Sequence, residues 1–217
     1  WLDVGDIWGI GRRLNKRFRE KGILKAWDLV NLPETFIQEQ MGIVGIRMIN
    51  ELKGIPQLEL EHPTKKKTIA TTRTFDTMSS DLRYLRERVS TFAVKCSERL
   101  RAQQSCCNYL TVFLHTNFFR EDLTQYHPSI TITLPNPQNS AIELSKAAQI
   151  ALEKIYRKGY LYKKAGVTVS GIIPETERQI SLFDEDSFMK HKPIMKIIDQ
   201  LNSKYHADKL KLGSQDI

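Results

Sequence analysis

The stretch SITITL, residues 129–134, alternates hydroxyl-bearing and aliphatic side chains without a break. Successive side chains of a β-strand point to opposite faces of the sheet, so this alternation predicts a strand. Ile130, Ile132 and Leu134 would face a core, and the hydroxyl groups would face the other way. The stretch therefore predicts a sheet that is covered on one face and open on the other.

The segments around this strand predict a β-α-β-β-α-β order. Strand-like patterns occur at TIATTRTF (68–75), Asn108–Thr116 and Gly166–Ile172. Apolar residues spaced three and four apart predict amphipathic helices at Asp81–Gln104 and Ile142–Tyr156. This order favours an α+β fold in which both helices pack on one face of a four-stranded antiparallel sheet.

The open face of this sheet is expected to carry hydroxyl groups, which donate hydrogen bonds to phosphates; a solvated face without a ligand is the alternative. RRM proteins stack RNA bases on aromatic residues of their central strands. The strand at 129–134 has no aromatic residue, which argues against this mode, although Tyr109 and Phe113 leave the phase of the strand at 108–116 open. The residues expected on the open face are Thr111, Thr131, Thr133, Thr168 and Ser170.

Residues 1–54 predict a separate, small helical domain with a tight turn near its start. In DIWGIGRRLNKRF (6–18), Gly9 and Gly11 flank one isoleucine and precede an amphipathic run. Glycines allow a tight turn, and the N–H groups that begin the next helix can bind an anion. This helix-hairpin-helix pattern holds a DNA phosphate without reading sequence; a purely structural turn is the alternative. The basic residues in reach of the same anion are Arg12, Arg13 and Lys16.

Two further helices are expected in this domain, at Ala26–Leu32 and Phe36–Leu52. Pro33 is placed to open the second of them, because proline is favoured in the first turn of a helix. Gly42 and Gly45 interrupt this helix and suggest a second, degenerate hairpin.

Residues 55–67 contain two prolines and alternating charges, which predict an extended linker. The linker ends in three lysines, Lys65, Lys66 and Lys67. A linker between two DNA-binding units passes close to the DNA backbone, so we expect these lysines to contact phosphates. Charges that only improve solubility are the alternative.

The net charge of +8 is concentrated in the first three quarters of the chain. Residues 12–25 contain seven Lys or Arg and one acidic residue, and residues 63–104 contain ten against four. This concentration favours a polyanionic partner over a merely soluble surface.

Other features of the sequence bear on its compartment. No apolar run approaches the length that a membrane span needs, and the first residues do not resemble a signal peptide. Three cysteines without a C-x-x-C motif indicate a reduced, intracellular compartment and no structural zinc. The first residue is Trp1 rather than Met, which suggests a fragment or a processed chain.

The sequence offers no recognisable catalytic constellation. Polymerases and many nucleases need carboxylates that converge on Mg²⁺ ions, and the acidic residues here are scattered over helices and loops. The five histidines lack metal-ligand spacing, and neither G-x-S-x-G nor a P-loop is present. Cys106 and Cys107 are interpreted as filling of a strand or loop. We therefore expect no catalytic residue, no metal site and no cofactor in this chain.

Three segments of the chain resemble the C-terminal half of UmuC-type Y-family translesion DNA polymerases, the family of the catalytic subunit of DNA polymerase V. They are VGDIWGIGRRL (4–14), TTRTF (71–75) and YLYKKAGVTVSGI (160–172). The resemblance covers essentially the whole chain in order. It implies a bacterial, cytoplasmic and nucleoid-associated protein that acts in SOS mutagenesis and DNA repair.

The resemblance also implies a division of the chain and a set of DNA contacts. Residues 1–54 are similar to the thumb, 68–173 to the little finger, and 174–217 to a short helical C-terminal extension. The family's catalytic carboxylates and Mg²⁺ belong to the palm, which precedes this region, so the resemblance implies binding of damaged or primer-template DNA without polymerisation. Phosphate contacts carry over to Gly9, Gly11 and Arg12 in the thumb and to Thr72, Arg73 and Thr74 in the little finger.

A late stretch, RQISLFDED (178–186), places large apolar residues in a charged tail. It resembles the bacterial clamp-binding pentapeptide Gln-Leu-Ser/Asp-Leu-Phe, with isoleucine at the second position. Such a peptide uses a Gln amide for hydrogen bonds and a Leu-Phe pair as anchors in a pocket. A segment that folds back on the little finger is the alternative; clamp binding predicts exposed residues. The residues concerned are Gln179, Ile180, Ser181, Leu182 and Phe183.

The final residues predict a helix, because Ile194, Ile197, Ile198 and Leu201 have helical spacing. The resemblance implies UmuD′ and RecA as partners without indicating which surface they use. The leading hypothesis is a fragment that binds DNA without sequence preference and tethers it to a sliding clamp. The alternative is a protein-interaction module that binds polymerase regulators and not DNA. An RNA-binding RRM-like protein and a hairpin-type glycosylase or nuclease are less favoured.

Overall fold

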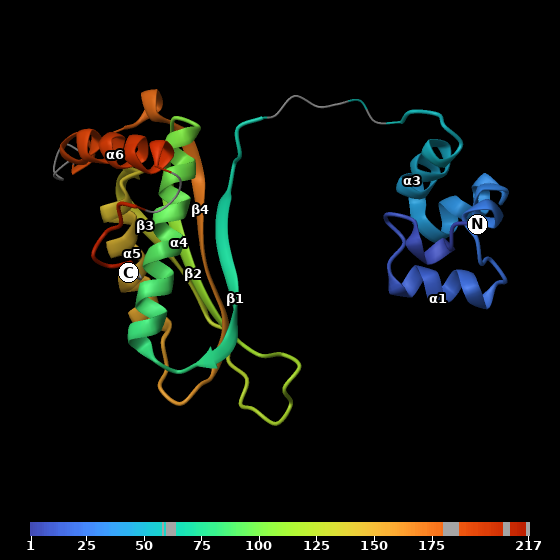
Figure 1. Ribbon diagram of the computed structural model, residues 1–217, viewed down its shortest axis with the longest axis horizontal. Helices are drawn as coiled ribbons and strands as arrows, with labels where there is room; N and C mark the ends of the chain where they lie inside the picture. The colour runs from blue at the N-terminus through green and yellow to red at the C-terminus, as the bar shows by residue number, and fades with distance from the viewer. Residues whose placement is uncertain (58, 60–63, 180–186, 206–208, 216–217) are drawn as a thin grey trace. The chain divides into compact units, whose positions relative to one another are not determined.

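The computed structural model describes residues 1–57, 59, 64–179, 187–205 and 209–215 of the chain (Figure 1). The chain forms two compact units, Trp1–Pro63 and Thr64–Ile217. Their boundary falls inside the stretch that was predicted as a linker.

The second unit contains a four-stranded antiparallel sheet in the order β1-β4-β2-β3. Figure 1 shows two long helices, α4 and α5, on one face of this sheet. The predicted α+β class and the β-α-β-β-α-β order are confirmed. The elements are β1 (Ile69–Ser79), α4 (Leu82–Ala102), β2 (Ser105–Thr116), β3 (Ser129–Gln138), α5 (Ala141–Ile155) and β4 (Tyr162–Pro174).

The main core lies between the two helices and the sheet. Leu110, Val112 and Leu114 of β2 are fully buried there, opposite Leu85 of α4 and Leu144 of α5. The alternation of strand residues and the helical spacing of helix residues bring these side chains to one apolar layer. Asp81 is the N-cap of α4, and its carboxylate accepts a hydrogen bond from the Arg83 N–H at 2.9 Å.

Strand β3 continues four residues beyond the end that the alternation predicted, through Pro135 and Pro137. Proline lacks the N–H that a residue of a central strand must donate, so the sequence predicted that the strand ends at Leu134, before Pro135. The structure tolerates both prolines because β3 is an edge strand of the sheet.

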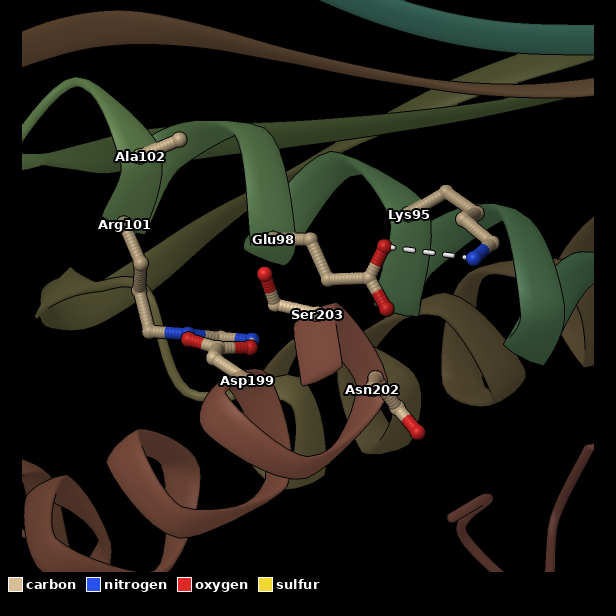
Figure 2. Close-up of a pocket in the computed structure, with 7 residues that line it drawn as sticks. All are labelled: Lys95, Glu98, Arg101, Ala102, Asp199, Asn202 and Ser203. Atoms are coloured by element: carbon tan, nitrogen blue, oxygen red, sulfur yellow. Dashed lines mark hydrogen bonds and ion pairs between the residues drawn. The ribbon is translucent and has the colours of Figure 1, made fainter. Parts of the chain in front are cut away.

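The C-terminal helix α6 (Ser187–Lys204) follows a short 3₁₀ turn, η2 (Glu175–Glu177), and packs against the body of the second unit. Met195 is buried beside Val94 and Ala141. Arg101 donates two hydrogen bonds of 2.6 Å to the Asp199 carboxylate, and Figure 2 shows the two side chains facing each other between α4 and α6. The last helix is therefore a packed part of the second unit.

The first unit is built from η1 (Val4–Asp6), α1 (Arg12–Glu20), α2 (Ala26–Val30) and α3 (Glu34–Leu52). Its small core is centred on Val4, Phe18, Leu29 and Ile37. Pro33 caps α3, and Gly42 breaks the helix with a φ of 66°. This φ lies in the left-handed region, which favours glycine, so the predicted interruption at this position is confirmed.

Gly166 in the central strand β4 gives a test of how tightly the sheet packs. A Cβ at this position would lie 2.5 Å from the Phe113 ring and 2.6 Å from the Thr72 methyl group. We expect Gly166→Ala to lower the free energy of unfolding by about 1–3 kcal/mol, because one of these groups must move. Urea denaturation measures this change.

Gly213→Ala is the matched control, since nothing lies within 4 Å of its added Cβ. Its effect should stay within about 0.5 kcal/mol. Equal stability of the two variants would contradict the tight packing of Phe113 against Gly166.

Candidate nucleic-acid interface

The turn before α1 has the backbone that the two glycines predict. Gly9 has a φ of 99°, which a residue with a side chain adopts only under strain. Gly11 is the cap residue of α1 and makes no side-chain hydrogen bond to the helix. The first-turn N–H groups of α1 therefore have no side-chain cap, and the positive end of the helix dipole faces outward.

The segment before this turn differs from a full helix-hairpin-helix, because it is only the three-residue 3₁₀ turn η1. The turn is held against the end of α1 by a bidentate ion pair. Arg19 donates to both Asp3 oxygens, at 2.7 and 2.8 Å. The pKa of Asp3 lies below its usual value because its carboxylate accepts a hydrogen bond from the Gly5 N–H and lies beside Arg19.

The cations around the turn fall into two groups. Arg17 and Arg19 are engaged, with Gln40 and Asp3 respectively. Arg12 and Arg13 are exposed and form no hydrogen bond or ion pair within the described part of the chain. The side chain of Lys16 is 81% exposed and lies 4.0 Å from Glu20. The structure thus places the predicted residues Gly9, Gly11, Arg12 and Arg13 at the N-terminal end of α1, whereas Lys16 lies one turn further along the helix, beside Glu20.

The second set of candidate residues lies on the sheet face away from α4 and α5. Strand pairing joins Thr72 with Gly166, Thr74 with Lys164, and Thr111 with both Thr131 and Thr168. These positions alternate with the buried aliphatic residues, so the predicted hydroxyl face exists as expected. Two of its hydroxyl groups bond to each other, Thr111 Oγ1 to Thr131 Oγ1 at 2.8 Å.

Arg73 does not share this face with Thr72 and Thr74. It pairs with Ala165, which is buried beneath the helices, so its side chain starts from the helix-covered side at the edge of the sheet. Arg73 is exposed there. The three residues that the resemblance grouped together therefore divide between two faces, because neighbouring residues of a strand always do.

The sequence argument against aromatic residues on the open face is wrong for β2. Tyr109 and Phe113 alternate with buried Leu110 and Val112, so they belong to the open face. The central position of β2 in the sheet makes these rings prominent. The alternation of residues 109–113 in the sequence already indicated this placement of the two rings. The prediction relied instead on the strand at 129–134, which has no aromatic residue.

The three lysines at the start of the second unit are exposed. Gln103, just beyond α4, fixes the main chain of Lys66: its side-chain oxygen accepts from the Lys66 N–H and its amide donates to the Lys66 carbonyl, both at 3.2 Å. The position of the main chain is therefore fixed where the second unit begins, at Lys65, Lys66 and Lys67.

The predicted clamp-binding peptide begins at Gln179, which is exposed. Ile180, Ser181, Leu182 and Phe183 lie outside the described residues. The residue before the peptide is held in place: Arg178 donates to the Pro137 carbonyl at 2.9 Å. Its guanidinium also lies 3.8 Å from the centre of the Phe188 ring, at the start of α6. The two flanks of the peptide therefore contact each other.

A hollow of about 420 Å³ lies between α4 and α6, lined by Lys95, Glu98, Arg101, Asp199 and Asn202 among others (Figure 2). Its charged groups pair with each other, Lys95 with Glu98 at 3.3 Å and Arg101 with Asp199. We therefore regard it as part of the α6 packing contact.

The described residues also bear on metal, membrane and cysteine chemistry. In that part of the chain, no group of three or more His, Cys, Asp or Glu side chains could hold a metal ion. No helix among the described residues is long and apolar enough to cross a membrane. Cys96, Cys106 and Cys107 are buried, and burial raises the pKa of Cys96 and Cys107. The interpretation of Cys106 and Cys107 as filling is confirmed.

Comparison with known proteins agrees with this architecture. Residues 66–182, more than half of the chain, match the impB/mucB/samB family C-terminal domain. The chain is 32% identical over 205 residues to the protein UmuC of Salmonella typhimurium, which covers 94% of this chain and 49% of that protein. It is 31% identical to the protein ImpB of Salmonella typhimurium over 92% of this chain and 47% of that protein. It is 25% identical to DNA polymerase IV of Staphylococcus aureus over 84% of this chain and 50% of that protein.

This chain belongs to the impB/mucB/samB family, and its second unit contains the C-terminal domain of that family. The resemblance to the C-terminal region of UmuC-type Y-family polymerases is confirmed. The chain spans about half the length of the curated relatives it matches.

The open face also contains a histidine whose charge can be predicted. Burial lowers the pKa of His115 below its usual value of 6.5, and His127 and Lys164 add to this effect. The unfolded chain therefore binds a proton at His115 more readily than the folded chain does. We expect the free energy of unfolding to decrease as the pH falls below about 6.5, and His115→Phe to remove part of this decrease.

Urea denaturation at several pH values between 8 and 5 measures this dependence. Above about pH 7.5 the free energies of unfolding of the wild-type and His115→Phe proteins should differ by a nearly constant amount, because His115 is then mostly neutral in both the folded and the unfolded state. An unchanged pH dependence in the His115→Phe variant would contradict the assignment.

Proposed function

We propose that this chain is the DNA-binding and clamp-tethering part of a translesion DNA polymerase. The observation that carries the proposal is the start of α1, where a helix N-terminus without a side-chain cap lies beside Arg12 and Arg13, which have no ion-pair partner among the described residues. Membership of the impB/mucB/samB family and similarity to a DNA polymerase IV support the link to DNA.

The chemistry of the first unit suits one phosphate group of a DNA strand. Main-chain N–H groups at a helix N-terminus point at an anion, and the helix dipole favours negative charge. The left-handed turn at Gly9 lets the chain approach the strand closely. Arg12, Arg13 and Lys16 add mobile positive charge without recognising any base. Such contacts fix the position of the protein on DNA and leave binding independent of sequence.

The second unit offers a complementary surface for the same substrate. Hydroxyl groups of Thr72, Thr74 and Thr168 lie on neighbouring strands of the open face. Each can donate a hydrogen bond to a phosphate or sugar oxygen. We propose that this face lies against the backbone of primer-template DNA, with Lys65, Lys66 and Lys67 contacting further phosphates.

The catalytic part of the reaction is proposed to reside outside this chain. The relatives that it matches are about twice as long, and the family resemblance assigns the Mg²⁺-binding carboxylates to the palm. The role that we propose for these 217 residues is to hold the template and primer while the palm performs nucleotide transfer.

The tether is proposed to be the peptide from Gln179 to Phe183, bound to a bacterial sliding clamp. Gln179 is exposed, and Arg178 and Phe188 hold the flanks of the peptide on the body of the second unit. Anchored flanks limit the conformations that the peptide must lose on binding, which favours affinity.

A second candidate function is the binding of regulatory proteins, and the surface of α6 favours it. Ile194 and Ile197 are 48% and 55% exposed, although Met195 between them is buried. UmuD′ and RecA are the partners that the family resemblance implies. Failure of the chain to bind DNA, with clamp binding retained, would favour this function over the first.

The backbone contacts predict a strong salt dependence of DNA binding. The logarithm of affinity for a primer-template duplex should fall with the logarithm of salt concentration, with a slope of about −0.9 for each phosphate contacted. We expect Arg12→Ala and Arg13→Ala each to reduce this slope by about one and to weaken all sequences equally. Fluorescence anisotropy at several salt concentrations measures both effects.

Arg83→Ala is a matched control, because Arg83 is also an exposed cation near the start of a helix, α4, on the helix-covered side of the sheet. It should leave the slope unchanged. A wild-type slope in the Arg12→Ala, Arg13→Ala double variant would refute the proposed role of α1.

The tether is tested by binding of the chain to a purified sliding clamp. We expect Phe183→Ala and Leu182→Ala each to lower clamp affinity by more than tenfold, because these side chains are the proposed anchors. The control is Glu177→Ala, an exposed position just before the peptide. Surface plasmon resonance measures the affinities, and unchanged binding by Phe183→Ala would show that another segment contacts the clamp.

A further inference from the structure

A row of aromatic rings runs along the open face of the sheet and continues into the connection between β2 and β3. It begins with Tyr109 and Phe113 on β2, which pair with Ser170 and Gly166 of β4. His115 follows two residues later, with its ring centre 4.8 Å from that of Phe113. Side chains on one face of a strand are spaced by about 7 Å, so the row spans several nucleotides.

The first two rings lie close to glycines of β4, where no Cβ occupies the space. A Cβ at Gly166 would meet the Phe113 ring at 2.5 Å, and a Cβ at Gly171 would meet the Tyr109 ring at 2.7 Å. Each ring therefore lies against a glycine, and Tyr109 is 43% exposed.

The row ends in a stack of rings at the β2–β3 connection. Phe118 stacks on His127 with ring centres 3.8 Å apart and planes at 10°, and His115 meets both rings at 5.3–5.6 Å. The Nδ1 atom of His127 is buried and has no hydrogen-bond partner among the described residues. This histidine is thus held by ring contacts rather than by a polar network.

The two phenylalanines of the β2–β3 connection are exposed to solvent. Phe118 is 62% exposed and Phe119 is 94% exposed, and Figure 1 shows the connection extending beyond the end of the sheet. The Gln125 amide orders it by donating to the carbonyls of Asn117, Arg120 and Leu123 at 2.8–3.1 Å. An ordered loop that presents apolar rings to solvent is a surface for a partner rather than part of the core.

The charges along the strands of the row favour an anionic partner. The strand-paired positions of the open face contain no carboxylate among the described residues, and they contain Lys164, whose ammonium lies 6.0 Å from the centre of the Phe113 ring. Carboxylates occur outside these positions: Asp76 lies on the unpaired part of β1, Glu121 is exposed in the β2–β3 connection, and Asp122 there is paired with Arg120. Burial lowers the pKa of His115, which keeps its ring neutral near pH 7. Flat rings beside hydroxyl groups and a cation are the combination that binds unpaired bases by stacking and the strand by its phosphates.

We propose that this aromatic row, from Tyr109 to Phe119, binds unpaired bases of a single-stranded stretch of DNA. The inference rests on the proposed function, since it assigns the open face of a DNA-binding unit to single strands as well as to the duplex backbone. Every base has a π-face, so the row binds without marked sequence preference.

An abasic oligonucleotide distinguishes stacking on the bases from binding to the DNA backbone alone. We would compare the full chain's affinity for a thymidine 12-mer, for an abasic 12-mer with the same phosphates, and for a blunt duplex. The thymidine strand is expected to bind at least tenfold more tightly than the abasic strand. Equal affinity for the two strands overturns the inference and leaves backbone binding intact. Failure to bind the blunt duplex as well overturns the proposed function.

Two variants locate the contact on the aromatic row. We expect Phe119→Ala and Tyr109→Leu each to lower affinity for the thymidine strand by about tenfold, and to leave affinity for the abasic strand unchanged. Ile150→Ala is the matched control, because Ile150 is 52% exposed on α5, across the sheet. Wild-type binding of the thymidine strand by both aromatic variants overturns the assignment.

A direct signal of stacking comes from an oligonucleotide that contains 2-aminopurine, whose fluorescence changes when its ring stacks. We expect the wild-type chain to change this fluorescence on binding and the Phe119→Ala variant to change it less. A uridine RNA 12-mer serves as the third ligand. Tenfold tighter binding of this RNA than of the thymidine strand overturns the assignment to DNA.

Discussion

The packing of α4 and α5 against one face of the sheet is the constraint on which the second unit depends. It buries one side of every strand, including Leu110 and Val112 of β2 and Val167 of β4. Because strand residues alternate, the same packing decides which residues remain on the other face. The hydroxyl groups and aromatic rings of that face are therefore positioned by the core beneath them rather than by contacts among themselves.

The first unit achieves its candidate site with a much smaller core. A single turn at Gly9 and Gly11 directs the N-terminus of α1 outward, and the pair of Asp3 with Arg19 holds the preceding segment. This ion pair is partly exposed to solvent, which screens it, so its contribution to stability is modest. Its role is geometric: it removes Arg19 from the available cations and leaves Arg12 and Arg13 for a ligand.

The C-terminal helix links the second unit to the proposed tether. The side chain of Arg101 is 12% exposed, and it donates to Asp199 and to the Asn139 carbonyl. Neither the charge pair nor the burial of Met195 was apparent from the helical spacing of residues 194–201. Helical spacing identifies an amphipathic helix, but it does not identify the surface that covers its apolar side.

The sequence alone determined the elements of this protein, because periods of two and of three to four residues distinguish strands from helices. It also determined the turn at Gly9 and Gly11, since a left-handed backbone requires glycine locally. Only the tertiary structure decided which strands lie side by side: Thr111 meets Thr131 of β3 and Thr168 of β4, and Phe113 lies beside Gly166. These contacts depend on strand pairing between residues far apart in the chain, which leaves no local pattern.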